Sequence, residues 1–328
     1  MSFTTVERTS PRLNRSQLFV PGVRPPLFEK AASGPADVIC LDLEDAVAPN
    51  DKPQARANII QALNTVNFGK KSISVRINGL DTHWCYRDVI DLVEQGGERL
   101  DLIMIPKVGT AADVYAIDML ISQAEAAVGR KKPIKLEVII ESVLGLNNID
   151  AIAASSKRLE SLHFGSADFA ASARMRTTNI GGVNSDYVVL TDKDAKGNRE
   201  THWADLWHYP LSRMVHAARA NGLRPIDGPY GDYSDPDGYN AQARRTAVLG
   251  CEGKWAIHPS QVALANEIYT PPQEEVKRAE EILVAMKEGT AKGMGAVALN
   301  GKLIDLASIR QAEVIVQQMQ MIREQTGN

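Results

Sequence analysis

The amino-acid sequence predicts an α/β protein built as a closed (β/α)8 TIM barrel with a C-terminal extension. Short apolar runs bounded by turn residues alternate with helical stretches, which is typical of a parallel sheet. Eight such units occupy about 250 residues, the usual length of a (β/α)8 barrel. No strand is followed by a GxGxxG loop, which argues against the structural alternative of an open, doubly wound sheet.

The expected strands each combine a short apolar run with turn or polar residues at its end. They lie within residues 16–22, 36–47, 71–80, 101–109, 135–145, 159–170, 222–232 and 253–262. The expected helices each follow a strand. They cover residues 26–32, 51–64, 86–94, 112–128, 147–155, 211–220 and 238–249.

A long polar insertion over residues 171–210 interrupts this alternation. Loops of this length after a strand are usually functional or mobile. The DAKGN stretch at 194–198 is typical of a turn or a hairpin tip. We assign residues 1–269, including the insertion, to a catalytic barrel.

The remainder of the chain is not part of the barrel pattern. TPPQEEV at 270–276 leads into an expected helix over 274–288, and a Gly-rich link follows it. An Asn-Gly turn then predicts a hairpin over 296–304, before a final helix that begins at Leu306. We interpret residues 270–328 as a helical and hairpin lid or oligomerisation element.

Composition and charge exclude several classes of protein. The net charge of −3 and the isoelectric point near 6.1 give no overall attraction to nucleic acid or membranes. The three cysteines lie far apart without metal-binding spacing, which favours a reducing compartment. The N-terminus shows no secretory signal, and no apolar run approaches the roughly 20 residues that span a bilayer. We therefore expect a soluble, cytoplasmic protein without nucleic-acid or membrane partners.

Polar side chains gather at the ends of the expected strands, where the βα loops of a barrel form its active site. These strand-end residues are Glu44, Asp45, Arg76, Asn78, Lys107, Glu141, Asp168, Asp227 and His258. One such residue is readily explained as a helix cap. Seven consecutive strands that end in this way predict a polar site at the mouth of the barrel.

Glu141 and Asp168 are the acids expected to share one ion, because they end neighbouring strands. Two carboxylates in a partly dry pocket repel one another unless a cation neutralises them. Oxygen ligands without His or Cys favour a hard ion, and two carboxylates with water and substrate suit Mg²⁺. The alternative is that Glu141 pairs with a barrel arginine while Asp168 caps the helix that begins in GSADFAAS.

Arg76, in SVRING, is a candidate to bind an oxyanion or carboxylate, since its planar guanidinium is permanently charged. Its alternative role is an internal salt bridge to Glu44 or Asp45. Lys107 is interpreted as an ion-pair partner of the acids in preference to a Schiff-base lysine. His258 is a candidate base, although a lone histidine beside proline more often packs or forms hydrogen bonds.

The ordered motifs resemble those of the acyl-CoA lyase family that includes citrate lyase β subunits. LFVPG, DLEDAVAP, VRING, IPKV, IIESVLG, FGSADFA, IDGP and WAIHPSQ occur in this order. GLDTHWCYRD, ADVYAID, GPYGDYSDPDG and LIDLASIRQAE are similar to the malyl-CoA lyase branch of that family. The resemblance covers residues 11–322, and its specificity comes from the whole set of motifs.

The resemblance implies a magnesium-dependent (β/α)8 lyase, with Mn²⁺ as an alternative ion. Its implied reaction splits (S)-malyl-CoA reversibly into acetyl-CoA and glyoxylate, and β-methylmalyl-CoA into propionyl-CoA and glyoxylate, through a thioester enolate. The implied assembly is a trimer-based homo-oligomer, a homohexamer, in which a neighbouring subunit completes each active site.

The resemblance also assigns roles to residues. Glu141 and Asp168 match the family's metal ligands, and Arg76 matches the arginine at the reacting carbonyl end of the substrate. Asp305, in LIDLAS, matches an acid from a neighbouring subunit and is the expected proton-transfer group, whereas taken alone it would cap the last helix. The matched coenzyme A and substrate contacts are Phe19, Arg24, Lys30, Ala167, Ile257 and His258. Without the resemblance, Phe19 is equally well explained as a core residue.

Other functions remain open from the sequence. A thioesterase of the same family would hydrolyse malyl-CoA, and a citryl- or citramalyl-CoA lyase would use a related substrate. A citrate-lyase-type β subunit would need a carrier protein, which the long tail and the insertion argue against. A coenzyme A-binding protein without activity is the alternative from a different class.

Overall fold

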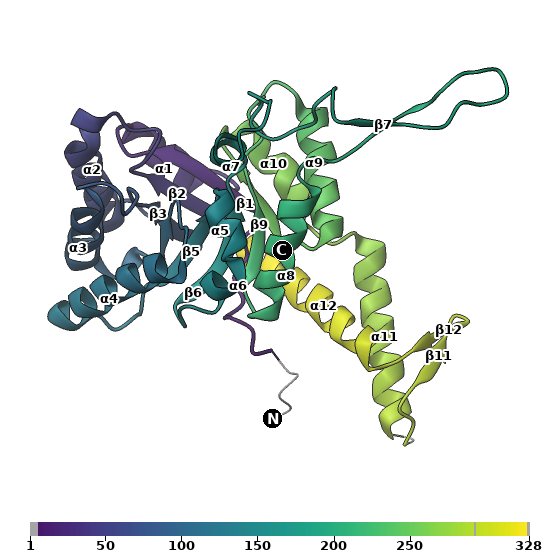
Figure 1. Ribbon diagram of the computed structural model, residues 1–328. Helices are drawn as coiled ribbons and strands as arrows, with labels where there is room; N and C mark the ends of the chain where they lie inside the picture. The colour runs from purple at the N-terminus through teal and green to yellow at the C-terminus, as the bar shows by residue number, and fades with distance from the viewer. Residues whose placement is uncertain (1–5, 292, 327–328) are drawn as a thin grey trace. The chain divides into compact units, whose positions relative to one another are not determined.

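The computed structural model describes residues 6–291 and 293–326 (Figure 1). Eight parallel strands close into a barrel, in which each strand pairs with the next along the chain and the last returns to the first. They are β1 (Ser16–Pro21), β2 (Val38–Asp42), β3 (Ser72–Arg76), β4 (Leu102–Ile105), β5 (Lys135–Ile140), β6 (Leu159–Phe164), β9 (Arg224–Asp227) and β10 (Gly253–Ala256). The predicted barrel is confirmed, and every strand lies within its expected range.

Helices follow the barrel strands. They are α1 (Pro26–Ser33), α2 (Lys52–Thr65), α3 (Cys85–Gln95), α4 (Ala111–Val128), α5 (Val143–Asn147), α6 (Ile149–Ala153), α7 (Ser166–Ser172), α8 (His208–Ala220), α9 (Pro236–Leu249) and α10 (Ser260–Ile268), with 3-10 turns η1 (Pro49–Asp51) and η2 (Gly97–Arg99). Local sequence explains the bounds of α4, which begins at a capping box of Thr110 and Asp113 and ends at Gly129 with φ of 65°. The helix expected over 147–155 is observed as the shorter α6, and the short helix α5 before it was not predicted; Asn148 leaves the helical conformation between the two.

The insertion carries one hairpin. Strands β7 (Val188–Leu190) and β8 (Thr201–Trp203) pair antiparallel outside the barrel sheet. Asp194 accepts a hydrogen bond from the backbone N–H of Gly197 at 2.9 Å, so the tip expected at 194–198 is confirmed.

A second compact unit begins at Glu267. It contains α11 (Gln273–Ala291), the hairpin of β11 (Val297–Leu299) and β12 (Lys302–Ile304), and α12 (Leu306–Thr326). Its own small core consists of Ala279, Ile282, Met286, Ile304 and Ala312. Across the residues that the structure describes, no helix has the length and apolar character needed to span a membrane.

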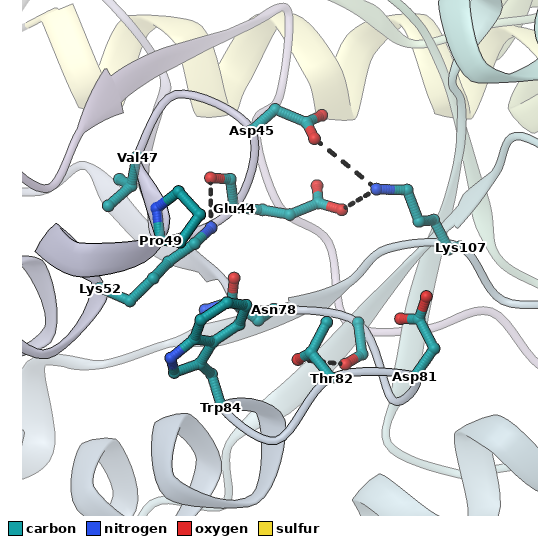
Figure 2. Close-up of a pocket in the computed structure, with 11 residues that line it drawn as sticks. Glu44, Asp45, Val47, Pro49, Lys52, Asn78, Asp81, Thr82, Trp84 and Lys107 are labelled. Atoms are coloured by element: carbon teal, nitrogen blue, oxygen red, sulfur yellow. Dashed lines mark hydrogen bonds and ion pairs between the residues drawn. The ribbon is translucent and has the colours of Figure 1, made fainter.

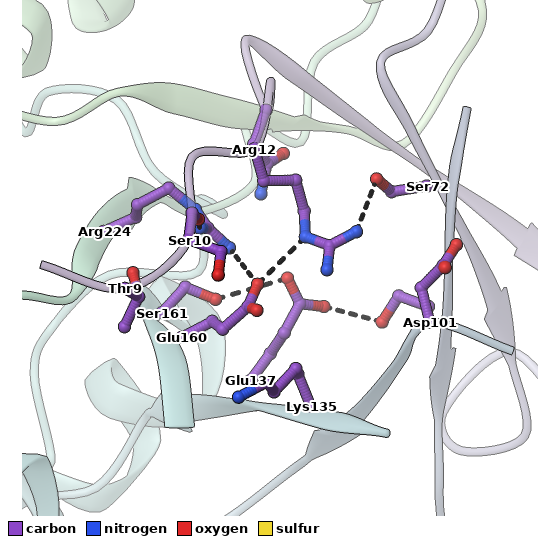
Figure 3. A network of polar contacts seen from close by, with 12 residues as sticks. Thr9, Ser10, Arg12, Ser72, Asp101, Lys135, Glu137, Glu160, Ser161 and Arg224 are labelled. Atoms are coloured by element: carbon purple, nitrogen blue, oxygen red, sulfur yellow. Dashed lines mark hydrogen bonds and ion pairs between the residues drawn. The ribbon is translucent and has the colours of Figure 1, made fainter. Parts of the chain in front are cut away.

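A buried polar network covers the N-terminal ends of the barrel strands (Figure 3). Arg12 donates from Nε to Glu160 Oε2 at 2.9 Å and from Nη1 to Ser72 Oγ at 2.8 Å. Arg224 donates from Nη2 to the same oxygen of Glu160 at 2.9 Å. Since Ser72, Glu160 and Arg224 stand at the starts of β3, β6 and β9, the segment before β1 closes this end of the barrel.

The barrel interior contains a second polar group around Glu137, which is fully buried. Gln17 and Ser74 donate to its Oε2 atom at 2.9 and 2.6 Å. Trp255 donates its indole N–H to His163 Nδ1 at 2.9 Å, and an indole can only donate. His163 therefore carries its proton on Nε2, which lies 3.2 Å from Glu137 Oε1. Although burial opposes ionisation, the hydrogen bonds from His163, Ser74 and Gln17 lower the pKa of Glu137.

Candidate active site

Arg76 ends β3 and is surrounded by carboxylates. Its Nε and Nη2 atoms donate to the two oxygens of Asp42, each at 2.7 Å. Its Nη1 atom lies 2.9 Å from Glu44 Oε2 and 3.2 Å from Asp45 Oδ2. The guanidinium carbon lies 5.2 Å from the centre of the Phe19 ring. The salt bridge that the sequence offered as an alternative is confirmed, and Asp42 is a stronger partner that sequence reasoning missed.

Lys107 follows β4 and joins the same carboxylates (Figure 2). Its Nζ atom lies 2.6 Å from Glu44 Oε1 and 3.6 Å from Asp45 Oδ1, so its interpretation as an ion-pair partner is confirmed. Lys52 anchors the loop between β2 and α2, because its Nζ donates to the carbonyls of Leu43 at 2.8 Å and Glu44 at 2.6 Å.

A cavity of about 290 Å³ opens beside this ion-pair cluster (Figure 2). Its walls come from the loops after β2, β3 and β4, and they mix charged, amide and aromatic groups. The lining residues are Glu44, Asp45, Val47, Pro49, Lys52, Asn78, Gly79, Asp81, Thr82, Trp84 and Lys107. Of the strand-end residues expected at the polar mouth, this cavity is lined by Glu44, Asp45, Asn78 and Lys107, whereas Arg76, Glu141, Asp168, Asp227 and His258 do not line it.

Glu141 follows β5 and is nearly inaccessible, with 4% of its surface exposed. Its Oε1 atom accepts a hydrogen bond from the backbone N–H of Lys107 at 2.6 Å. Burial, and then the charges of Glu44 and Asp168, raise the pKa of Glu141 to about 8. No salt bridge joins Glu141 to an arginine among the described residues, so the positive charge that this carboxylate requires has no side-chain source in contact with it.

Asp168 lies in the first turn of α7 and is half-buried. Gly165 is the N-cap of α7 and no side chain caps that helix end, so the proposed capping role of Asp168 is wrong. Within the described chain, the side chain of Asp168 forms no hydrogen bond or ion pair. Asp168 does lie close enough to Glu141 for its charge to oppose ionisation there.

Gly165 provides the space in which the Glu141 side chain lies. A Cβ atom at position 165 would lie 2.4 Å from Glu141 Oε2 and 2.5 Å from Glu141 Cβ. Real Cβ atoms do not approach other atoms so closely, and any side chain at 165 would displace Glu141.

The pair of Glu141 and Asp168 fits a hard divalent cation. Both supply oxygen donors, and neither carboxylate is neutralised by a side-chain cation in contact with it. In residues 6–291 and 293–326, no cluster of three or more His, Cys, Asp or Glu side chains forms a metal site. The protein would therefore supply two ligands, and water and substrate oxygens would complete the coordination.

The other predicted contact residues lie on strands, loops and helices, with Lys30 in α1 and Ala167 in α7. Phe19 is half-buried and its ring centre lies 4.2 Å from that of Trp255, which agrees with a packing role. His258 is exposed, stacks on Tyr233 at 4.7 Å and shares a 2.8 Å hydrogen bond with Ser260. The remaining predicted residues, Arg24, Lys30, Ala167 and Ile257, are exposed, and the backbone N–H of Ile257 donates to Gln261 Oε1 at 2.9 Å.

Asp305 belongs to the second unit and caps α12. Its Oδ1 atom accepts hydrogen bonds from the backbone N–H groups of Ala307 and Ser308, each at 3.0 Å. The N-cap role that the sequence alone gave it is confirmed. These hydrogen bonds, first those of Ser308, lower the pKa of its carboxyl group.

Asp227, another of the strand-end acids, pairs with a cation outside the carboxylate cluster. Its Oδ2 atom lies 2.7 Å from Lys254 Nζ, and both side chains are fully buried. The sequence gives little signal for this pair, because Lys254 lies within a buried strand where an apolar residue is the usual choice.

Comparison with known proteins agrees with this geometry. A family model described as HpcH/HpaI aldolase/citrate lyase matches residues 15–259. A Cereibacter sphaeroides protein named L-malyl-CoA/beta-methylmalyl-CoA lyase is 57% identical over 322 residues, which cover 98% of this chain and 99% of that protein. A Chloroflexus aurantiacus protein named malyl-CoA/beta-methylmalyl-CoA/citramalyl-CoA lyase is 38% identical, over 87% of this chain and 81% of that protein.

The fold also matches solved structures. CitE from Mycobacterium tuberculosis, crystallised with magnesium, acetoacetate and coenzyme A, has a TM-score of 0.68 to this chain. The two are 26% identical, and the match covers 93% of this chain and 98% of that one.

Proposed function

The chain belongs to the HpcH/HpaI aldolase/citrate lyase family, and we propose that it is a carbon–carbon lyase that acts on acyl-CoA thioesters. Its proposed reaction is the reversible cleavage of (S)-malyl-CoA into acetyl-CoA and glyoxylate, and of β-methylmalyl-CoA into propionyl-CoA and glyoxylate. The observation that carries the proposal is the buried Glu141 carboxylate, which lies near Asp168 and Arg76 at the mouth of the barrel.

Glu141 and Asp168 would hold Mg²⁺, with Mn²⁺ as an alternative ion. The magnesium complex of the mycobacterial neighbour supports this assignment. When bound, the ion supplies Lewis acidity toward the carbonyl oxygen of the 2-oxo acid.

The cleavage reaction needs a base, a group that stabilises negative charge on the reacting oxygen, and a proton donor for the enolate. A base removes the hydroxyl proton of malyl-CoA, and that oxygen's electron pair forms the carbonyl of glyoxylate. The electrons of the broken C–C bond pass to the thioester enolate, which takes a proton and becomes acetyl-CoA. Arg76 stabilises negative charge on the reacting oxygen, and its two hydrogen bonds to Asp42 keep the guanidinium in place.

We assign proton transfer to Asp305 of a neighbouring subunit. The backbone hydrogen bonds at the start of α12 favour the ionised carboxylate, which is the form that a base requires. In this proposal the 270–328 segment acts as a lid in a trimer-based homohexamer. The insertion at 171–210 is assigned to the barrel domain.

Coenzyme A would lie across the β1 side of the mouth. Arg24 and Lys30 are exposed cations on an otherwise slightly acidic protein, and they suit its phosphate groups. Phe19 would pack against the pantetheine arm. The remaining proposed substrate contacts are Ala167, Ile257 and His258.

The proposal is tested by incubating the purified protein with acetyl-CoA, glyoxylate and Mg²⁺, with and without a chelator. Formation of malyl-CoA that the chelator abolishes is the expected result. In the reverse assay, malyl-CoA should yield glyoxylate and acetyl-CoA in equal amounts. Release of malate and free coenzyme A without glyoxylate would identify a thioesterase instead, and no turnover at all would leave a binding protein.

A further inference from the structure

Lys107 has an unusual backbone conformation. Its φ is 54°, in the left-handed region that residues other than glycine, asparagine and aspartate rarely occupy. The described chain contains two other such residues, Arg174 and Asn300, with φ of 54° and 51°. Asn300 lies in a hairpin turn and Arg174 follows the end of α7, where this conformation is common. Lys107 lies in neither setting, and such outliers cluster at functional sites.

This conformation lets one residue reach two carboxylates. The backbone N–H of Lys107 donates to Glu141 Oε1 at 2.6 Å. The Lys107 ammonium lies 2.6 Å from Glu44 Oε1, a contact drawn in Figure 2. The hydrogen bond to Oε1 orients the Glu141 carboxylate. The Oε2 atom accepts no hydrogen bond from the residues that the structure describes.

The anchor at Glu44 is itself fixed. Its Oε2 atom lies 2.9 Å from Arg76 Nη1, and its backbone carbonyl accepts a 2.6 Å hydrogen bond from Lys52. Glu44 is 5% exposed, whereas the Lys107 side chain is 40% exposed, so solvent reaches this ion pair from the lysine side only. The Lys107 side chain is therefore tied to a rigid part of the barrel mouth.

We propose that Lys107 is a positioning residue for Glu141. Its ion pair with Glu44 holds a strained backbone in place, so that its N–H fixes the Glu141 carboxylate for a divalent cation. Glycine would adopt this backbone without strain, so it would not need the ion pair with Glu44 to hold the backbone in place. This inference rests on the proposed metal-binding function of Glu141 and Asp168.

The test compares two truncations of the same side chain. Lys107→Ala and Lys107→Gly both remove the ammonium, but only glycine adopts a positive φ without strain. We expect Lys107→Ala to weaken Mg²⁺ binding by about 10- to 100-fold, as loss of an outer-shell partner commonly does. Lys107→Gly should retain an affinity within about threefold of the wild type, because its N–H still reaches Glu141. Calorimetric titration of the substrate-free protein with Mg²⁺ gives both values.

The matched control uses Arg174, which has the same φ and also carries a cation. Arg174→Gly should melt at a higher temperature than Arg174→Ala, while the two bind Mg²⁺ equally. Thermal melting of all four variants without metal then separates a general gain in stability from an effect on the site.

Equal losses of Mg²⁺ affinity in Lys107→Ala and Lys107→Gly would overturn the inference, since the ammonium itself would then act. Wild-type affinity in both would overturn it as well. The lyase assay is independent of these titrations: a protein that shows the expected order of Mg²⁺ affinities but cleaves no malyl-CoA would refute the proposed reaction alone. A wild-type protein that binds no Mg²⁺ would refute both.

Discussion

The substitution Gly165→Ala tests whether the position of Glu141 controls the chemistry. The new Cβ atom would lie 2.5 Å from Glu141 Cβ, whereas ordinary contact begins at 3.4 Å, so one of the two must move by about 1 Å. Gly165 has φ of −98°, which alanine also adopts, and the effect therefore comes from the contact alone.

The expected magnitude follows from this displacement. A catalytic group misplaced by about 1 Å can cost about 100-fold in rate, and overpacking costs about 1–3 kcal/mol in the free energy of unfolding. We expect kcat/KM for malyl-CoA cleavage to fall about 100-fold, with a weaker affinity for Mg²⁺. Glyoxylate release, trapped with phenylhydrazine, measures the rate, and denaturant unfolding measures the stability.

Gly34→Ala is the control for the added methyl group. A Cβ atom at position 34 would meet its nearest neighbour, the carbonyl oxygen of Ala31, at an ordinary 3.4 Å. This variant should keep the wild-type rate. A folded Gly165→Ala protein with undiminished kcat/KM and Mg²⁺ affinity would refute the placement of Glu141 at the reacting centre.

Three further predictions concern the metal site, the proposed base and the core. The raised pKa of Glu141, about 8, keeps its carboxyl group protonated at lower pH. The Mg²⁺ affinity should therefore rise about tenfold per pH unit up to about pH 8 and then level off, and Mg²⁺ titrations across this pH range measure it. Asp305→Asn should reduce kcat strongly while Mg²⁺ and coenzyme A still bind; unchanged turnover would remove Asp305 from the mechanism. Lys254→Met leaves the Asp227 carboxylate buried without its cation, so denaturant unfolding should show a loss of about 3–5 kcal/mol, and a loss below 1 kcal/mol would contradict the importance of that pair.

The barrel was predictable because its signals are local and repeated. Each strand is a short apolar run with a helix behind it, and eight repetitions leave few arrangements other than a closed parallel barrel. Helix α5 was not predictable in this way, since its first residues lie within the range 135–145 expected for the fifth strand and Gly145 within it disfavours a helix.

The partners of the site residues were harder to predict than the residues themselves. Arg76 and Glu44 were identified from their places at strand ends. Asp42, which forms two of the hydrogen bonds to Arg76, was passed over because it belongs to the apolar run of β2. The parallel register that sets Asp42 opposite Arg76 depends on how two strands align, and no single motif records that alignment.

The left-handed backbone of Lys107 was also beyond sequence reasoning. A lysine after Ile105-Pro106 gives no sign of positive φ, because the residue types that favour this region are glycine and asparagine. The feature becomes visible only when the contacts to Glu44 and Glu141 are seen together.

The barrel interior is filled by buried side chains, and Arg12, Glu160 and Arg224 cover its N-terminal end, which has a kinetic consequence. Both reactants of a condensation must therefore enter through the mouth of the barrel. The smaller reactant, glyoxylate, would bind deeper than the thioester. Glyoxylate would then enter before the thioester and depart after it, so acetyl-CoA and glyoxylate should show the inhibition patterns of a compulsory-order enzyme.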